Sequence, residues 1–99
     1  MTTEVKEIDG VLTAFLNGRL DTFSSQQCRE DLEPLFANAG KKLVLDCANL
    51  EFISSSGLRV FVELVKKVGE EHGELSLQNL NDDVHNIFVI AGFAKRFNI

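Results

Sequence analysis

The sequence predicts a small α/β fold in which a mixed β-sheet carries its helices mainly on one face. Strand-length apolar segments alternate with helical patterns along the chain, which is typical of strands joined by crossover helices. An Asp9-Gly10 pair separates the first two β-rich segments and signals an antiparallel hairpin. A chain of 99 residues has room for one hydrophobic core, so residues 1–99 are predicted to form a single domain.

Composition and charge exclude several functional classes. The chain carries 10 basic and 15 acidic residues, a net charge of −5, and its basic residues are scattered, so binding to nucleic acid or to an anionic membrane is not expected. No apolar run approaches the roughly 18 residues that span a bilayer, and the first residues do not resemble a secretory signal. Cys28 and Cys47 are too few for a disulfide framework or a zinc site. We expect a cytoplasmic protein without metal or cofactor, and nothing demands more than a monomer.

Four strands are expected from the apolar pattern. The third segment shows little alternation, which is typical of a strand buried on both faces. The segment after it, residues 48–54, is expected to be a loop that leads into a helix. The predicted strands span residues 4–8, 11–16, 42–47 and 75–77.

The first predicted helix follows the hairpin. Ser24 followed by Gln27 fits a capping box, and Phe23 with Cys28 fits the hydrophobic staple around it. Pro34 lacks a backbone donor and should kink or break this helix near its last turns.

Two further helices are predicted in the second half of the chain. Apolar residues recur with helical spacing over residues 58–68, which indicates one buried stripe. Asn81 or Asp82 is expected to cap the last helix, and Gly92 to stop it. The tail is predicted to pack back onto the body through Phe93, Phe97 and Ile99.

No catalytic arrangement is apparent in the sequence. His72 lies in a polar stretch and His85 at the expected edge of the last helix, so neither is a convincing acid or base. The chain has no Gly-x-Ser-x-Gly elbow and no phosphate-binding Gly-x-x-x-x-Gly-Lys loop. The sequence therefore predicts a protein that is not an enzyme.

Three consecutive serines, Ser54, Ser55 and Ser56, precede Gly57 where the third strand leads into a helix. One serine is enough to cap a helix, and a glycine in the first turn lowers helix stability by about 1 kcal/mol relative to alanine. This combination suggests a site where the backbone is closely approached. Asp21 follows another strand and precedes another helix, so it could lie at the same end of the domain; taken alone, it is better explained as a turn or capping acid.

Three motifs follow one another along the chain. They are Gly-Arg-Leu-Asp at residues 18–21, Leu-Val-Leu-Asp at 43–46 with Phe-Ile-Ser-Ser-Ser-Gly-Leu at 52–58, and Ile-Ala-Gly-Phe at 90–93. With these motifs the chain resembles, over essentially its whole length, a STAS domain and within that family a bacterial anti-sigma factor antagonist. Such proteins commonly carry Gly-Glu-Leu-Asp at the first motif and Asp-Ser-Ser/Thr-Gly-Leu at the second.

The resemblance implies a partner-switching role. Antagonists of this kind bind an anti-sigma factor that is also a serine kinase, and this binding frees the sigma factor. The kinase then phosphorylates the serine two residues before the glycine, here Ser55, the complex separates, and a PP2C-type phosphatase resets the cycle. The resemblance also implies that Asp21 lies beside this serine, and we predict a partner-binding surface of Asp21, Ser54, Ser55, Ser56 and Gly57.

Ser54 departs from the family pattern, since most phosphorylatable members have Asp there. A hydroxyl at this position is compatible with an alternative, a STAS domain that is not phosphorylated and acts as a scaffold or ligand-sensing module. An enzyme with a serine nucleophile is a third hypothesis. An all-parallel sheet would instead favour a receiver-like domain with Asp46 as the phosphate acceptor.

Overall fold

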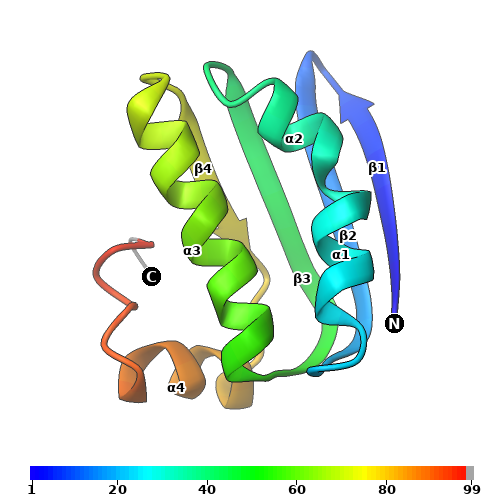
Figure 1. The fold of residues 1–99 in the computed structure, drawn as a ribbon, viewed down its shortest axis with the longest axis vertical. Coiled ribbons are helices and arrows are strands. Elements are labelled where there is room, and N and C mark those ends of the chain that lie inside the picture. Colours follow the sequence, from blue (N-terminus) through cyan, green and yellow to red (C-terminus); the bar gives the residue numbers. More distant parts are fainter. Residues whose placement is uncertain (98–99) are drawn as a thin grey trace.

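The computed structural model describes residues 1–97, which form a four-stranded mixed sheet (Figure 1). Its strands are β1 (Thr2–Ile8), β2 (Val11–Leu20), β3 (Lys42–Ile53) and β4 (Glu74–Gln78). They lie in the order β1-β2-β3-β4; the first two pair antiparallel, whereas β3 pairs parallel with both β2 and β4. This confirms the predicted mixed sheet and argues against the receiver-like alternative.

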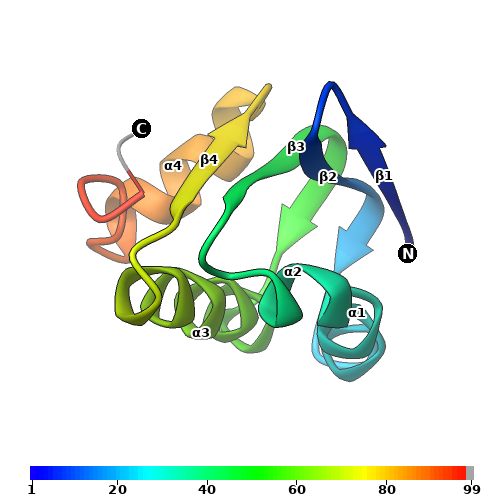
Figure 2. The same cartoon turned by 90° about the horizontal axis from the view of Figure 1, so that it is seen from above.

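The helices lie mainly on one face of this sheet, as predicted. They are α1 (Ser25–Asp31), α2 (Glu33–Ala37), α3 (Ser55–Glu70) and α4 (Asp82–Ile90). Figure 2 shows α1, α2 and α3 together beneath the strands. In Figure 1, α4 lies near the first turn of α3, at the end of the domain where β2 and β3 finish.

The β1–β2 hairpin turns at Asp9 and Gly10, as the sequence predicts. Asp9 has φ 51° and Gly10 has φ 81°, so both central residues occupy the left-handed region that a type I′ turn requires. The turn therefore matches the right-handed twist of the two strands.

The core lies between the sheet and the helices, with an aromatic cluster at the α4 end. Phe61 on α3 and Phe88 on α4 are fully buried, and their ring centroids are 6.0 Å apart. Phe97 lies 5.1 Å from Phe88 and is also buried, which confirms that this part of the tail packs back onto the body. Phe93 is half-buried, and Ile99 lies outside the described residues.

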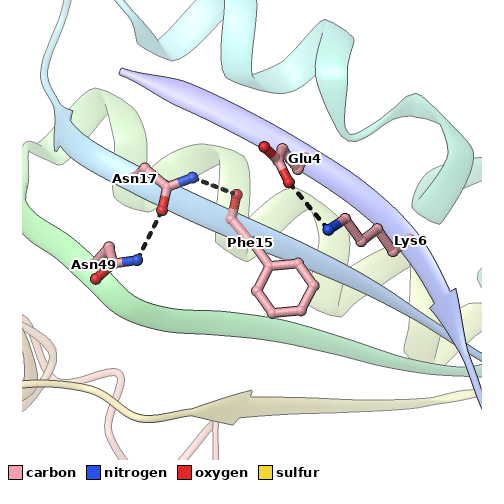
Figure 3. Close-up of polar contacts among 5 residues, drawn as sticks. All are labelled: Glu4, Lys6, Phe15, Asn17 and Asn49. Atoms are coloured by element: carbon pink, nitrogen blue, oxygen red, sulfur yellow. Dashed lines mark hydrogen bonds and ion pairs between the residues drawn. The ribbon is translucent and has the colours of Figure 1, made fainter.

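β3 is longer than predicted, because residues 48–53 continue the strand where a loop was expected. Its pairing with β2 shifts register between Phe15 and Asn17 and again after Gly18. At each shift β3 contains one residue more than β2, which is the geometry of a β-bulge. Beside the first shift, the Asn49 amide donates to the Asn17 side-chain oxygen at 3.0 Å (Figure 3). The bulges break the two-residue alternation, so the sequence pattern does not reveal a strand here.

The break expected at Pro34 is present. Pro34 lies in the first turn of α2, and Leu32 ends α1 and begins α2. A missing backbone donor is tolerated at the first turn of a helix but not in its interior. The helical segment is therefore divided in two, and α2 ends at Ala37.

The predicted capping box and hydrophobic staple at Ser24 are wrong. Ser24 has helical backbone angles, and its side chain makes no capping bond to α1. Phe23 is 95% exposed and does not pack on buried Cys28. The reason is that the helical turn begins earlier, since the Ser25 N–H donates to the Asp21 carbonyl at 3.0 Å. Phe23 thus belongs to the first turn and points into solvent.

Asn81, rather than Asp82, caps α4. The Asn81 side-chain oxygen accepts from the Val84 N–H at 2.7 Å, and its amide nitrogen donates to the Leu50 carbonyl of β3 at 3.0 Å. One side chain therefore both begins α4 and ties it to the sheet.

Candidate functional site

The ends of β2 and β3 are joined where the serine motif begins. The Ser54 N–H donates to the Leu20 carbonyl at 2.8 Å. The turn that follows β2 and the start of α3 that follows β3 therefore lie at the same end of the domain, the lower end in Figure 1. These segments carry Asp21 and Ser55. The motifs at residues 18–21 and 52–58 are therefore brought together, as the prediction of a surface shared by Asp21 and the serines requires.

The three serines have different surroundings. Ser54 is the cap of α3, and its hydroxyl oxygen accepts from the Gly57 N–H at 3.1 Å. Ser55 is the first residue of α3 and is exposed, whereas Ser56 is half-buried. Within residues 1–97, the Ser55 hydroxyl makes no hydrogen bond to another side chain or to the backbone. Ser54 thus caps the helix, and Ser55 is the most exposed of the three serines.

Gly57 allows β2 to pack directly against the first turn of α3. A Cβ atom at this position would lie 2.5 Å from Leu20 Cγ and 3.1 Å from Ile53 Cγ1. Both side chains are buried, so neither can move away freely. A glycine is therefore required in this helix because Leu20 and Ile53 approach its backbone closely. The close approach expected from the sequence is made by the protein's own strands β2 and β3.

Gly57→Ala is expected to lower the free energy of unfolding by up to about 2 kcal/mol. Overpacking a dense core costs roughly 1–3 kcal/mol, and the better helix propensity of alanine returns about 1 kcal/mol. Urea denaturation measures the change. Gly69→Ala is the matched control, because it lies on the same helix with nothing within 4 Å of the added methyl; it should be neutral or stabilising. Equal behaviour of the two variants would contradict the close packing.

Asp21 forms a reciprocal pair with Ser24. Its carboxylate accepts from the Ser24 N–H at 2.9 Å and from the Ser24 hydroxyl at 3.0 Å, and the Asp21 N–H donates to Ser24 Oγ at 3.0 Å. These bonds, first the one from the Ser24 backbone, lower the pKa of the half-buried Asp21 carboxyl group. The Asp-x-x-Ser spacing could have indicated this turn. Asp21 is therefore a capping acid that stays ionised at neutral pH.

Two hollows flank the first turn of α3. One, of about 280 Å³, lies on the α1 side and includes Ser56 and Arg59. The other, of about 400 Å³, lies on the side of the C-terminal segment and includes Ser55, Arg59 and Phe93. Arg59 is exposed and borders both hollows. Arg59 belongs to none of the sequence motifs, although its spacing of four from Ser55 places the two residues on one helix face.

Three large apolar side chains are exposed on the elements at this end, and the third, Val89 of α4, is less exposed than the other two. Phe23, in the turn before α1, is 95% exposed, and Ile90, the last residue of α4, is 86% exposed. Aromatic side chains are enriched in protein interfaces, so the exposed Phe23 ring is a candidate contact for a protein partner. The sequence pattern indicated a staple for Phe23, so its exposure became visible only in the fold.

Metal and thiol chemistry have little support in the described part of the chain. Residues 1–97 contain no cluster of three or more His, Cys, Asp or Glu side chains suited to a metal ion. Burial raises the pKa of Cys28 to about 11 and that of Cys47 to about 12, so both thiols stay protonated and unreactive. Over the same residues, no helix is long and apolar enough to cross a bilayer.

Known proteins match the chain over nearly its full length. The BtrV protein of Bordetella bronchiseptica is 33% identical over 99 residues, which cover 100% of this chain and 85% of that protein. The anti-sigma-B factor antagonist of Bacillus subtilis is 32% identical over 99 residues, covering 100% and 90%. An anti-sigma factor antagonist from Mycobacterium paratuberculosis has the same fold, with a TM-score of 0.82, 24% identity and coverage of 97% and 81%. The STAS domain model matches residues 2–99, and the chain belongs to the STAS domain family.

Proposed function

We propose that this protein is a cytoplasmic anti-sigma factor antagonist. It binds an anti-sigma factor that is also a serine kinase, releases a sigma factor, and is switched off when that kinase phosphorylates Ser55. A PP2C-type phosphatase restores the free form. The observation that carries the proposal is the exposed Ser55 hydroxyl at the first position of α3, in a STAS domain related to an anti-sigma-B factor antagonist. On this proposal the chain is a binding module and not an enzyme.

The proposed partner-binding surface comprises Asp21 and the Ser54, Ser55 and Ser56 turn. Gly57, which the sequence also placed in this surface, is buried against Leu20 and Ile53 and supports the turn from beneath. The hydrogen bond from Ser54 to Leu20 supports it, because this bond joins the two segments at one end of the domain. Exposed Phe23 and Ile90 are suitable apolar anchors beside the polar turn, since a few aromatic and aliphatic residues usually carry most of the binding energy of an interface.

The switch follows from the charge of the phosphate. Phosphorylation adds roughly −1.5 to −2 charges at neutral pH. The N-terminus of α3 favours an anion, so the domain stays folded. In a complex, the same group would have to lose its water and would lie near the ionised Asp21 carboxylate, and both effects weaken binding.

Incubated with its cognate anti-sigma kinase and ATP, the protein is expected to take up one phosphate, on Ser55. Ser55→Ala should abolish uptake and retain binding, because it removes only a small exposed hydroxyl. Ser55→Asp should weaken binding, and by less than phosphate does, because it carries less charge. Mass spectrometry locates the phosphate, and calorimetry with the anti-sigma factor measures affinity.

Ser56→Ala is the matched control for this experiment. It removes a half-buried hydroxyl from the same turn and should leave phosphate uptake unchanged. Phosphate found on Ser54 or Ser56 would contradict the assignment of Ser55.

The second candidate function is a scaffold or ligand-sensing STAS domain that is not phosphorylated. The observation that favours it is Ser54, which caps α3 through a neutral hydroxyl where phosphorylatable relatives commonly have an acid. Ser54→Asp separates the two functions, because Asp keeps the cap and restores the acid. If the host kinase modifies Ser54→Asp but not the natural protein, the switch proposal fails and the scaffold function is supported.

A further inference from the structure

We propose that Arg59 is the intramolecular partner of the phosphate on Ser55 and binds it across one turn of α3. This inference rests on the phosphorylation of Ser55 proposed above and concerns what the phosphorylated domain does with its new charge. The arginine would hold the phosphate against the surface of α3, in the state in which the partner is absent.

The placement of the two side chains supports this pairing. Ser55 and Arg59 are both exposed, lie four residues apart on α3, and line the same hollow of about 400 Å³. Side chains on a helix lean toward its N-terminus, so Arg59 leans toward the turn that carries Ser55. An acidic group four residues before a basic one is also the favourable order on a helix.

Two acidic side chains near Arg59 in the fold already have partners. Glu63, one turn beyond Arg59, lies 3.5 Å from the Arg29 guanidinium. Asp21 is held by Ser24. Within residues 1–97, Arg59 makes no ion pair within 4.0 Å. Its guanidinium group is therefore available to a new anion.

The chemistry of the two groups fits a direct contact. Guanidinium presents parallel N–H donors that match two phosphoryl oxygens, and such charge-assisted bonds are shorter and stronger than neutral ones. The remaining contacts in the hollow come from apolar groups, namely Leu58, Val62, Ala91 and Phe93. They offer no competing acceptor side chain for Arg59.

The test measures the second pKa of the phosphate by phosphorus NMR. Phosphoserine is placed at position 55 during protein synthesis with a phosphoserine-specific suppressor tRNA, so no kinase is needed. Arg59 favours the dianion, and Arg59→Gln should therefore raise this pKa by roughly half a pH unit. The Arg59 side-chain Nε–H signal of the natural sequence should also shift when the unmodified and phosphorylated proteins are compared.

Lys66→Gln is the matched control, since it removes the same charge from an exposed position on the same helix. Lys66 lies 11 residues beyond Ser55, about 16 Å along a helix, and its replacement should change the pKa much less. Equal shifts for the two variants, or an unmoved Arg59 signal, would overturn the pairing. The kinase assay is a separate experiment. If no kinase modifies the protein, the proposed switch is wrong. If Arg59→Gln leaves the second pKa of the phosphate unchanged, only the pairing of Arg59 with the phosphate is wrong.

Discussion

Gly73→Ala is expected to lower the free energy of unfolding by about 3 kcal/mol. Gly73 lies between α3 and β4, where its N–H donates to the Val68 carbonyl at 2.9 Å. A Cβ atom there would lie 2.0 Å from the Ala39 carbonyl oxygen and 2.7 Å from that of Lys41. These are backbone atoms of the connection between α2 and β3, so the clash can be relieved only by shifting the backbone and not by turning a side chain.

Thermal unfolding followed by circular dichroism measures this effect. A loss of about 3 kcal/mol should lower the melting temperature by roughly 10 to 20 °C in a domain of this size. The control is again Gly69→Ala, four residues earlier, whose added methyl meets nothing within 4 Å. A melting temperature for Gly73→Ala within a few degrees of that control would show that the segments are not in close contact.

Phe88→Ala is expected to lower the free energy of unfolding by about 3 to 5 kcal/mol. Phe88 is fully buried and stacks edge-on against Phe97 at 5.1 Å and beside Phe61 at 6.0 Å. Removing its ring leaves a cavity that two other rings line, and α4 loses its aromatic contact with Phe61 of α3. Chemical denaturation should show a lower midpoint.

Ile90→Ala is the control for this variant. It truncates a large apolar side chain on the same helix, but one that is 86% exposed, so the stability change should stay within about 0.5 kcal/mol. If both variants lose similar stability, the contacts of the Phe88 ring are not what holds α4 on the domain. Calorimetry with the anti-sigma factor should show weaker binding for Ile90→Ala if this side chain is part of the proposed surface.

The fold class followed from short-range chemistry in the sequence. Asp9 and Gly10 accept positive φ angles and therefore specify the hairpin. Pro34 divides the first helical segment because it lacks a donor. The apolar stripe of α3 requires a sheet to cover it. Each of these depends on residues close in the chain, so a local pattern reveals it.

The end of β3 and the start of α1 could not be predicted in this way. The bulges that extend β3 to Ile53 arise from its pairing with β2, and they remove the alternation that identifies a strand. The beginning of α1 depends on the pairing of Asp21 with Ser24. The sequence fits this pair and a capping box of Ser24 with Gln27 equally well. Local patterns are ambiguous wherever two caps or two periodicities fit the same residues.

In the candidate site, too, some features follow from neighbouring residues and others only from the tertiary structure. The sequence by itself determined that Ser54, Ser55, Ser56 and Gly57 begin a helix, because hydroxyl caps and a first-turn glycine are properties of neighbouring residues. Only the tertiary structure decided that Leu20 packs on Gly57 and that Ser54 bonds to the end of β2. These contacts join segments more than 30 residues apart in the sequence. They form only when parallel strands end at one edge of the sheet, and no local pattern encodes that meeting.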